Sequence, residues 1–403
     1  MYDFHDDECP MPQTFRSRIG LTAFLGWLFY LGFVTRVMFA PLMPEIQADL
    51  GISYGQAGSL FLMISIGYLV SPICSGFISS RIRHRGTLTL SAWLVALSLL
   101  PFAFIESLWA VRVLLILIGL SAGLHLPSAI ATITAEIRKD DWGKALSVHQ
   151  LAPPLSFVTA PLIAALLMNW FSWRMVLVVW SSAALVSAIA FTMRGQGGDF
   201  TGQLPSLENI KTVLCKSSFW IMVLLFAMAM GGNAGIYAML PLFLVTERGL
   251  DLSWANTLIG LSQASGLLMV IAAGFVADRI GQKQTMAVSL LCAGIATVLL
   301  GVLTGKSLVL ILFIQPMVLN SFFPSAFAAL SRVAEPRMRS VTSALGPPTA
   351  FLIGGGVLPS VIGYLGQTYT FSAGIILAGC FILLGPLLLI FLKLGLYDNE
   401  SGC

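Results

Sequence analysis

Long apolar runs separated by short polar intervals cover the chain from residue 19 to residue 392. Each run has about the 20 residues that a helix needs to cross a bilayer. The runs are continuous, whereas a transmembrane barrel would need short segments that alternate with period two. The pattern therefore predicts an all-α membrane protein with twelve transmembrane helices. The predicted spans are 19–41, 54–79, 87–104, 109–135, 145–168, 175–193, 219–245, 255–276, 284–304, 308–330, 341–366 and 371–392.

The longest polar interval divides six runs from six. It covers residues 194–218 and contains Gly195, Gly197, Gly198 and Pro205, as a linker would. We therefore predict five segments in chain order: a cytosolic tail (1–18), a six-helix bundle (19–193), a cytosolic linker (194–218), a second six-helix bundle (219–392) and a cytosolic tail (393–403).

The two halves resemble each other in sequence. GFISSRI at 76–82 returns 198 residues later as GFVADRI at 274–280, and LPSAIA at 126–131 returns 197 residues later as FPSAFA at 323–328. Six spans bring the chain back to the same side of the membrane. The halves are therefore parallel repeats, related by an axis along the membrane normal.

Composition agrees with this pattern. The chain is 57% hydrophobic and only 10% charged, with a mean hydropathy of +0.89. Soluble domains carry about 25% charged residues, so a water-soluble protein is excluded. The net charge of +4 is dispersed between the spans, and no nucleic-acid partner is expected.

The basic residues predict the orientation. Placing both termini in the cytosol assigns most of the 22 lysines and arginines to that side, as the positive-inside rule requires. The first 18 residues lack an apolar core, so we expect no cleavable signal peptide. The short loops are typical of a multi-pass protein of a bacterial inner membrane.

Enzyme and cofactor signals are missing from the sequence. The six cysteines are scattered without a C-x-x-C pair, and there is no phosphate-binding loop or nucleophile–base arrangement. The run from His5 to Cys9 could hold a metal, but a solvated tail is the simpler interpretation. We expect no enzyme activity, no cofactor and no metal.

One cation interrupts the first apolar run. Arg36 lies in GWLFYLGFVTRVMFAPLMP, and no Asp or Glu lies inside any comparable run. A charge at the bilayer centre costs about 3 kcal/mol or more unless it faces a wet cavity with something to bind. Because no carboxylate in the spans neutralises Arg36, an anionic solute is the natural counter-ion. A structural cation capped by main-chain carbonyls is the alternative.

The loop after the eighth span resembles the G-x-x-x-D-R-x-G-x-[RK] signature of the major facilitator superfamily. The matching positions are Gly274, Asp278, Arg279, Gly281 and Lys283. The first-half copy keeps Gly76 and Arg81, but Ser80 replaces the acid and Arg83 replaces the second glycine. Twelve spans, a central linker and a tandem repeat fit the same superfamily over essentially the whole chain.

This resemblance implies a monomeric carrier that works by alternating access. In the superfamily, helices one, four, seven and ten line a central cavity, and two bundles rock about it. The conserved loop acts as a gate on the cytosolic side. Here only Asp278 and Arg279 keep both loop charges, so the resemblance implies an asymmetric gate.

The first span also resembles that of the organic-anion symporters within the superfamily, where the arginine equivalent to Arg36 meets the substrate carboxylate. Arg36 precedes Pro44 by eight residues, and an acidic amphipathic segment follows. The chain departs from this branch in the fourth span, where Ala122 replaces the acid that carries the coupling proton. The branch's coupling chemistry therefore does not transfer intact.

Other polar residues in the spans are candidate substrate ligands. The repeat offset relates Arg36 to Asn233, and Tyr237 follows Asn233 by one helical turn on the same face. Gln315 and Asn320 are further candidates. Polar side chains in membrane helices also bond neighbouring helices, and this alternative stays open for all four.

Two histidines could carry the coupling proton. His125 lies in the fourth span and His149 near the start of the fifth, and an imidazole changes charge near pH 6.5. His125 is also a candidate substrate ligand. Neutral packed histidines are the alternative for both residues.

Three functions follow from these patterns. The first is a secondary active transporter that moves a small carboxylate-like anion, with proton coupling or exchange against a counter-substrate. The second is an efflux carrier for lipophilic or drug-like compounds that depends on aromatic residues such as Phe29 and Phe33. The third is a non-transporting receptor built on a carrier fold. In each case the partners are small molecules and membrane lipid.

Overall fold

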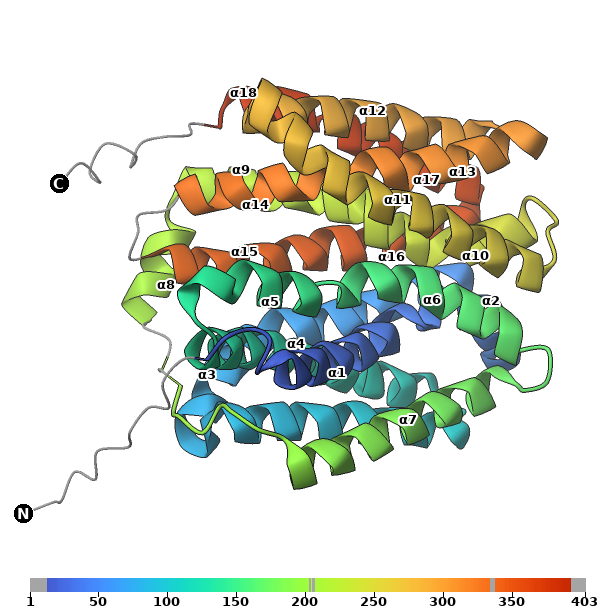
Figure 1. Cartoon of the computed structure of the whole chain (residues 1–403). Helices are drawn as coiled ribbons and strands as arrows, with labels where there is room; N and C mark the ends of the chain where they lie inside the picture. The colour runs from blue at the N-terminus through green and yellow to red at the C-terminus, as the bar shows by residue number, and fades with distance from the viewer. Residues whose placement is uncertain (1–12, 203, 205–206, 334–337, 393–403) are drawn as a thin grey trace, which may run out of the picture.

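A computed structural model describes residues 13–202, 204, 207–333 and 338–392 of the chain. Most of the predicted tail 1–18 and all of the tail 393–403 lie outside the described residues. In the described part, helices run side by side along one common direction, with the first half of the chain below the second in Figure 1. The chain enters and leaves the bundle at the same end, where the linker helix also lies (left in Figure 1).

The first half contains α1 to α7. An isolated bridge between Gln13 and Ile137 joins the start of the described chain to the end of α4. Two short 3-10 turns, η1 (Leu100–Ala103) and η2 (Lys139–Asp141), flank α4. The helices are α1 (Ile19–Val37), α2 (Phe39–Leu50), α3 (Tyr54–Leu99), α4 (Leu108–Glu136), α5 (Trp142–His149), α6 (Ala152–Leu167) and α7 (Trp173–Arg194).

The second half begins after the short linker helix α8 (Leu207–Leu214). It contains two π-helical turns, η3 (Gly231–Gly235) and η5 (Leu352–Val357). Its helices are α9 (Ser217–Met230), α10 (Ile236–Thr246), α11 (Leu252–Ile280), α12 (Gln282–Val302), α13 (Gly305–Asn320), α14 (Phe322–Val333), α15 (Arg339–Phe351), α16 (Leu358–Thr368), α17 (Phe371–Leu383) and α18 (Gly385–Ile390).

These helices account for the twelve predicted spans. Ten described helical stretches are long and apolar enough to cross a membrane. One of them, Tyr54–Ala103, is 50 residues long and contains two spans, because the backbone leaves the helical region at Arg83. These ten stretches hold eleven spans, and the 29-residue helix α11 supplies the twelfth. The predicted fold class is confirmed, while the exact division into two bundles at 193 and 219 stays a prediction.

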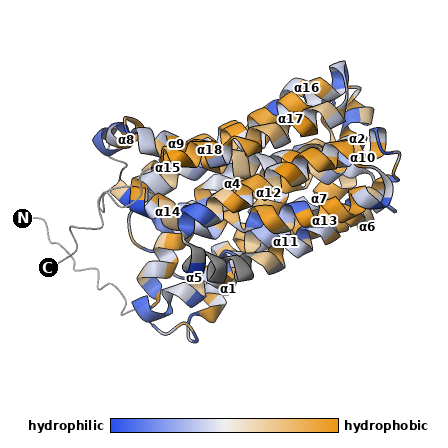
Figure 2. Cartoon of the chain, turned by 90° about the horizontal axis from the view of Figure 1, so that it is seen from above, coloured by the Kyte–Doolittle hydropathy of each residue, from blue (hydrophilic) through white to orange (hydrophobic). Residues whose placement is uncertain are grey.

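The outer surface suits a lipid bilayer. Many large apolar side chains are exposed, among them Val186, Leu310 and Ile390, which are 64 to 69% exposed. In Figure 2, apolar residues dominate the length of the helices, and hydrophilic residues gather towards the two ends and on α8. Burying this surface in lipid removes an apolar area that would otherwise make the protein associate in water.

The repeat is visible in the backbone at Arg83. Arg83 has φ 66° and ψ 170°, and Gly281, its partner 198 residues later, has φ 89° and ψ 152°. This region of backbone space is essentially reserved for glycine. Both halves therefore make the same sharp turn between their second and third spans, but the first half makes it with a strained arginine.

Both halves also break their first span at matching positions. In the first half, α1 gives way to α2 at Met38, because Pro41 has no N–H to donate to the carbonyl of Val37. In the second half, the π-helical turn η3 ends at Gly235, which is 197 residues after Met38. These breaks place irregular backbone midway along the first and seventh spans.

The halves meet at the end opposite the termini. Asn256 of α11 donates to the carbonyl of Pro41 at 3.1 Å, across the two halves. A Cβ on Gly58 would lie 2.4 Å from the carbonyl oxygen of Pro359, and one on Gly363 would lie 2.3 Å from that of Tyr54. Backbones that approach so closely seal this end.

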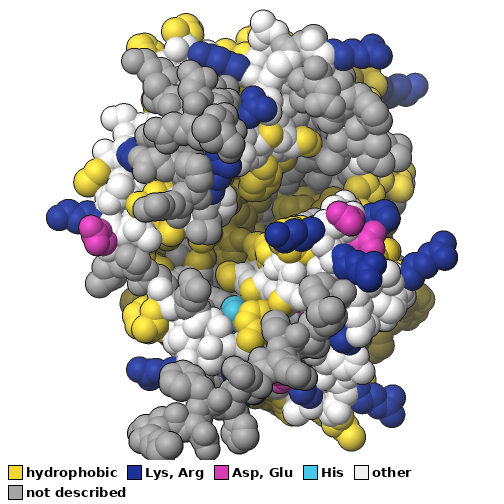
Figure 3. All heavy atoms as spheres, turned by 60° about the vertical axis from the view of Figure 1, so that its left-hand side comes forward, with side chains coloured by type: hydrophobic (Ala, Val, Ile, Leu, Met, Phe, Trp, Pro, Cys, Tyr) yellow, Lys and Arg dark blue, Asp and Glu magenta, His cyan; other side chains and the backbone are white. Residues whose placement is uncertain are grey.

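The other end is open. Figure 3, which brings the terminal end forward, shows a hollow whose visible lining is mainly hydrophobic and whose rim carries Lys and Arg side chains. The structure is therefore closed at one end and open at the end that carries the termini.

Candidate functional site

A small cavity of about 30 Å³ lies between the two halves, around Arg36. It receives side chains from α1, α3 and α6 of the first half and from α10, α15 and the π-helical turns of the second. Among the described residues that line it, Arg36 carries the one charge and Tyr237 the one side-chain hydroxyl. The lining residues are Phe33, Arg36, Val37, Phe61, Ile64, Phe157, Ala234, Tyr237, Phe351 and Gly355.

Arg36 is 5% exposed and lies in the last turn of α1. Its guanidinium carbon lies 4.3 Å from the centre of the Phe33 ring and 4.4 Å from that of Tyr68. Cation–π contact and the negative end of the α1 dipole both stabilise the charge. Neither supplies a counter-ion.

No carboxylate neutralises Arg36 in the described part of the chain, where the ion pairs all involve other residues. Its Nε is buried without a hydrogen-bond partner. No main-chain carbonyl of the described residues accepts a bond from it, so the capped structural cation, the alternative to substrate binding, lacks its expected contacts. A buried, uncompensated guanidinium is costly in the absence of a ligand.

Tyr237 approaches the same cavity from the second half. Its ring meets that of Phe157 edge to face at 4.9 Å, and its hydroxyl is buried without a partner. Ala234 and Gly355, from the two π-helical turns, complete this wall. The Tyr237 hydroxyl and the Arg36 Nε, neither of which has a hydrogen-bond partner, thus belong to residues that line the same cavity.

The amide candidates have partners within the second half. Asn233 donates to Asn320 at 2.7 Å. Gln315 is 5% exposed and donates to the carbonyl of Gly232 at 2.8 Å and to the Thr297 hydroxyl at 3.3 Å. These bonds join the seventh, ninth and tenth spans, and none of the three amides lines the Arg36 cavity.

The two histidines are brought together. His125 of α4 and His149 of α5 are 3% and 0% exposed, and their Nε2 atoms lie 3.4 Å apart. Their rings are parallel, and both stack with Phe29 of α1, at 5.5 and 4.7 Å between centres. The Nδ1 of His149 has no hydrogen-bond partner.

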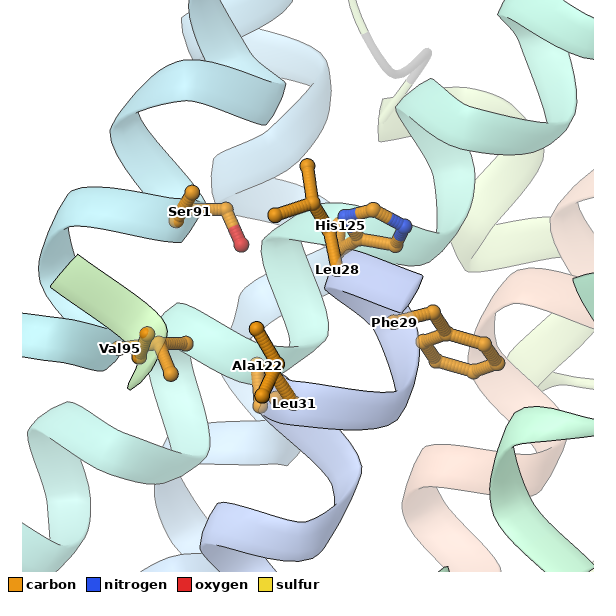
Figure 4. A pocket seen from close by; sticks show the side chains of 10 residues that line it. Leu28, Phe29, Leu31, Ser91, Val95, Ala122 and His125 are labelled. Atoms are coloured by element: carbon orange, nitrogen blue, oxygen red, sulfur yellow. The ribbon is translucent and has the colours of Figure 1, made fainter. Parts of the chain in front are cut away.

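Phe29 and His125 also border a small void inside the first half, with Ser91 and Ala122 on its other walls (Figure 4). The void has room for about one water-sized probe, at about 10 Å³. Ala122 stands where the resembled symporters carry their acid. The histidine pair therefore lies next to the position that sequence comparison would assign to proton coupling.

An aromatic contact connects the histidine pair to Arg36. Phe29 and Phe33 meet edge to face at 6.0 Å, and Phe33 stacks on the Arg36 guanidinium. The spacing 29, 33, 36 places all three residues on one face of α1. Movement of this face would change the surroundings of the histidines and of the arginine together.

The predicted gate residues are only partly described. Gly76 and Arg81 lie in α3, where Arg81 is exposed, and Gly281 adopts its positive φ. Arg279 is exposed at the end of α11, and Lys283 donates to the carbonyl of Leu392 at 3.1 Å. Gly274 lies in α11, but its surroundings and the side chain of Asp278 lie outside the described residues.

Two residues of the site escaped sequence analysis. Tyr68 stacks on Arg36, and Phe157 meets both Phe33, at 5.7 Å, and Tyr237. Neither is polar enough to stand out in an apolar run, and Tyr68 has Ser265 at its repeat-related position. No pattern in the sequence could have found them.

Comparison with curated proteins gives distant relatives. The chain is 24% identical over 289 residues to the membrane sensor protein UhpC of Escherichia coli (strain K12), which covers 66% of this chain and 65% of that protein. It is 25% identical over 303 residues to the probable anion transporter 3, chloroplastic, of Oryza sativa subsp. japonica, covering 67% of this chain and 57% of that protein. The chain thus spans less than two-thirds of the length of these relatives.

Solved structures share the fold. A bacterial homologue of the human lysosomal transporter Spinster, in an inward-facing and occupied conformation, superposes with a TM-score of 0.81 at 14% identity. The match covers 94% of this chain and 97% of that one. Residues 22–346 match the sequence model of the Major Facilitator Superfamily. With twelve spans and a cavity between its two halves, this multi-pass membrane chain belongs to the Major Facilitator Superfamily.

Proposed function

We propose that this transporter carries a small organic anion by alternating access, with Arg36 as the anion-binding residue. One observation carries the proposal: a buried arginine without a carboxylate faces an unpartnered tyrosine hydroxyl from the other half of the molecule. A guanidinium is planar and permanently charged, and it binds carboxylates in a bidentate manner. An anion between Arg36 and Tyr237 would satisfy both halves at once.

Binding at this place would couple to the rocking of the halves. Phe157 and Tyr237 touch across the halves, and so do Tyr68 and Phe351, at 5.5 Å. A ligand held by both sides stabilises the state in which they approach, as alternating access requires. Asn233, Gln315 and Asn320 stay predictions as substrate ligands, each already bonded to a neighbour.

The proposal includes an orientation. The basic rim of the open end and the positive-inside rule both favour a cytosolic location for the termini. In that orientation the described state is open to the cytosol. We place the protein as a monomer in a cell membrane of the bacterial inner-membrane type.

The proposed coupling ion is a proton, held by His125 and His149. The two Nε2 atoms, 3.4 Å apart, share one N–H in the neutral pair, and one additional proton would give the pair a positive charge in the half that also holds Arg36. An anion bound at Arg36 offsets that charge. Anion and proton binding would then favour each other, and this linkage is reciprocal. Phe29 is the described residue that stacks on both rings, and Arg36 is the nearest cation along α1.

A carrier for lipophilic compounds is the second candidate. The hydrophobic lining of the hollow favours it. Such a cargo would not need Arg36, so one variant separates the two functions.

The first test measures saturable uptake or exchange of radiolabelled organic anions in proteoliposomes. Arg36→Gln should lower transport at least tenfold, because losing a charged hydrogen bond to a ligand costs roughly 2–5 kcal/mol. Arg112→Gln is the matched control, since Arg112 stacks on Trp109 at 5.2 Å and does not line the cavity. Anion transport that survives in Arg36→Gln contradicts the proposal. Arg36-independent transport of a lipophilic cation would favour efflux instead.

The second test concerns the proton. Uptake should rise as external pH falls, because the proposed protonation of the histidine pair accompanies anion binding. His125→Gln with His149→Gln should flatten this profile while leaving anion binding measurable. His84→Gln is the control, because His84 bonds Ser128 at 3.2 Å, outside the stacked pair. If the double variant keeps the pH profile of the wild type, the histidines do not carry the proton. Exchange against a counter-substrate then becomes the mode of transport.

A further inference from the structure

The Arg36 cavity has a composition that selects among anions. It offers one guanidinium and one hydroxyl, and the other eight lining residues are apolar. Three of these eight are phenylalanines that touch the polar pair or its neighbours: Phe33, Phe157 and Phe351. A ligand in this place would therefore meet one positive charge and a wall of aromatic rings.

The guanidinium has little room for a second anionic group. The rings of Phe33 and Tyr68 lie against it at 4.3 and 4.4 Å and occupy two of its sides. What remains is the donor edge that includes the unpartnered Nε, which suits a single carboxylate or sulfonate. A second negative charge would be left unpaired against an apolar wall, which is strongly unfavourable.

The neighbouring amides already form hydrogen bonds to other groups, and none of them lines the cavity. Asn233 and Asn320 bind each other, and Gln315 binds a main-chain carbonyl and a threonine. A sugar or hydroxy acid would lose its hydrogen bonds to water and find few replacements. Burying a hydroxyl without a hydrogen-bond partner is unfavourable. An apolar body would instead gain free energy in proportion to the apolar area that leaves water.

We infer that the substrate is a monoanion with an apolar or aromatic body, of the aryl- or alkyl-monocarboxylate class, and not a sugar phosphate or a dicarboxylate. The inference rests on the proposed function and narrows it. Arg36 and Tyr237 hold the charged group, and Phe157 packs on the body. Phe157 is the ring that determines selectivity, because it contacts Phe33 of its own half and Tyr237 of the other.

The test uses the purified full-length chain and measures binding by titration calorimetry. The probes are phenylacetate, acetate, succinate and glucose 6-phosphate. Phenylacetate should bind at least tenfold more tightly than acetate, and the other two should not compete with it at millimolar concentration. Phe157→Ala should weaken phenylacetate about tenfold and leave acetate unchanged, whereas Arg36→Gln should weaken both. Phe327→Ala is the matched control, since Phe327 is 49% exposed and packs on Phe226.

Transport adds a readout that passive permeation does not affect. Benzenesulfonate keeps its charge at every pH of the assay, and its uptake into proteoliposomes should exceed that of methanesulfonate. If acetate equals phenylacetate, or if glucose 6-phosphate or succinate binds more tightly and still needs Arg36, this inference is wrong while anion transport stands. If no anion binds and transport of a lipophilic cation does not depend on Arg36, both this inference and the proposed function are wrong.

Discussion

Single residues carry the unusual chemistry of this protein. Arg36 is charged in an apolar span, and three features allow it to stay there: the C-terminal end of α1, two aromatic rings, and a position between the halves where a ligand can arrive. None of these neutralises the charge. The uncompensated free-energy cost of burying this charge would favour the proposed binding of an anion.

Arg83 offers a test of backbone strain at the same scale. Arg83→Gly should raise the free energy of unfolding by about 1–3 kcal/mol, because glycine adopts φ 66° and ψ 170° without the penalty that arginine pays. Thermal unfolding in detergent measures the change. Arg81→Gly is the matched control. It lies in the helical part of α3 and should cost about 1 kcal/mol. A loss of stability in Arg83→Gly would show that the arginine side chain contributes more than the strain removes.

At the scale of elements, each half joins its first span to its last span through one acidic residue. In the first half, Asp49 at the end of α2 accepts bonds from Arg174 and from Trp173 Nε1, at the start of α7. In the second half, Glu247 after α10 accepts bonds from Ser372 N at 3.0 Å and from the backbone of Phe371, at the start of α17. The repeat has kept the position of the acid, but Glu247 accepts from the backbone at a helix N-terminus as well as from the Ser372 hydroxyl, at 2.7 Å.

Glu247 should stabilise the start of α17, because a carboxylate at a helix N-terminus satisfies backbone donors and is favoured by the helix dipole. Glu247→Ala should lower the free energy of unfolding by about 1–2 kcal/mol. The exposed Glu106, in the loop before α4, supplies the control substitution Glu106→Ala, expected to be neutral. Equal melting temperatures for the two variants would mean that the α17 contact is not needed for stability.

At the scale of the whole molecule, the structure is sealed at one end and open at the other. The seal depends on backbone approach at Gly58 and Gly363 and on the bond from Asn256 to Pro41. The Arg36 cavity lies between the halves, and the proposed alternating access would open it to each side of the membrane in turn. Two further hydrogen bonds cross the halves there, from Gly55 N to Gln367 and from the Ser360 hydroxyl to the carbonyl of Gly58.

Gly58→Ala tests this seal. Its Cβ would lie 2.4 Å from a main-chain oxygen, so the halves must separate at that end. Spin labels at Glu45 and Lys306, both exposed at that end, should show a longer distance by double electron–electron resonance, together with slower transport. Gly20→Ala, which meets nothing within 4 Å, should leave both unchanged. An unaltered distance distribution in Gly58→Ala would mean that the glycine seal does not set the conformation.

The sequence by itself determined the spans, the repeat and the lone arginine, because hydrophobic length and charge are written locally along the chain. It also named Tyr237 as a candidate on the same helix face as Asn233, the repeat-related position of Arg36, and it singled out both histidines by their rarity in apolar runs. Only the tertiary structure decided which groups share a cavity. It paired Asn233 with Asn320, gave Gln315 a main-chain partner, stacked His125 and His149 on Phe29, and brought Tyr68 and Phe157 to the arginine. Contacts between spans depend on helix rotation and on the breaks at Met38, η3 and η5, and local hydrophobicity does not encode these.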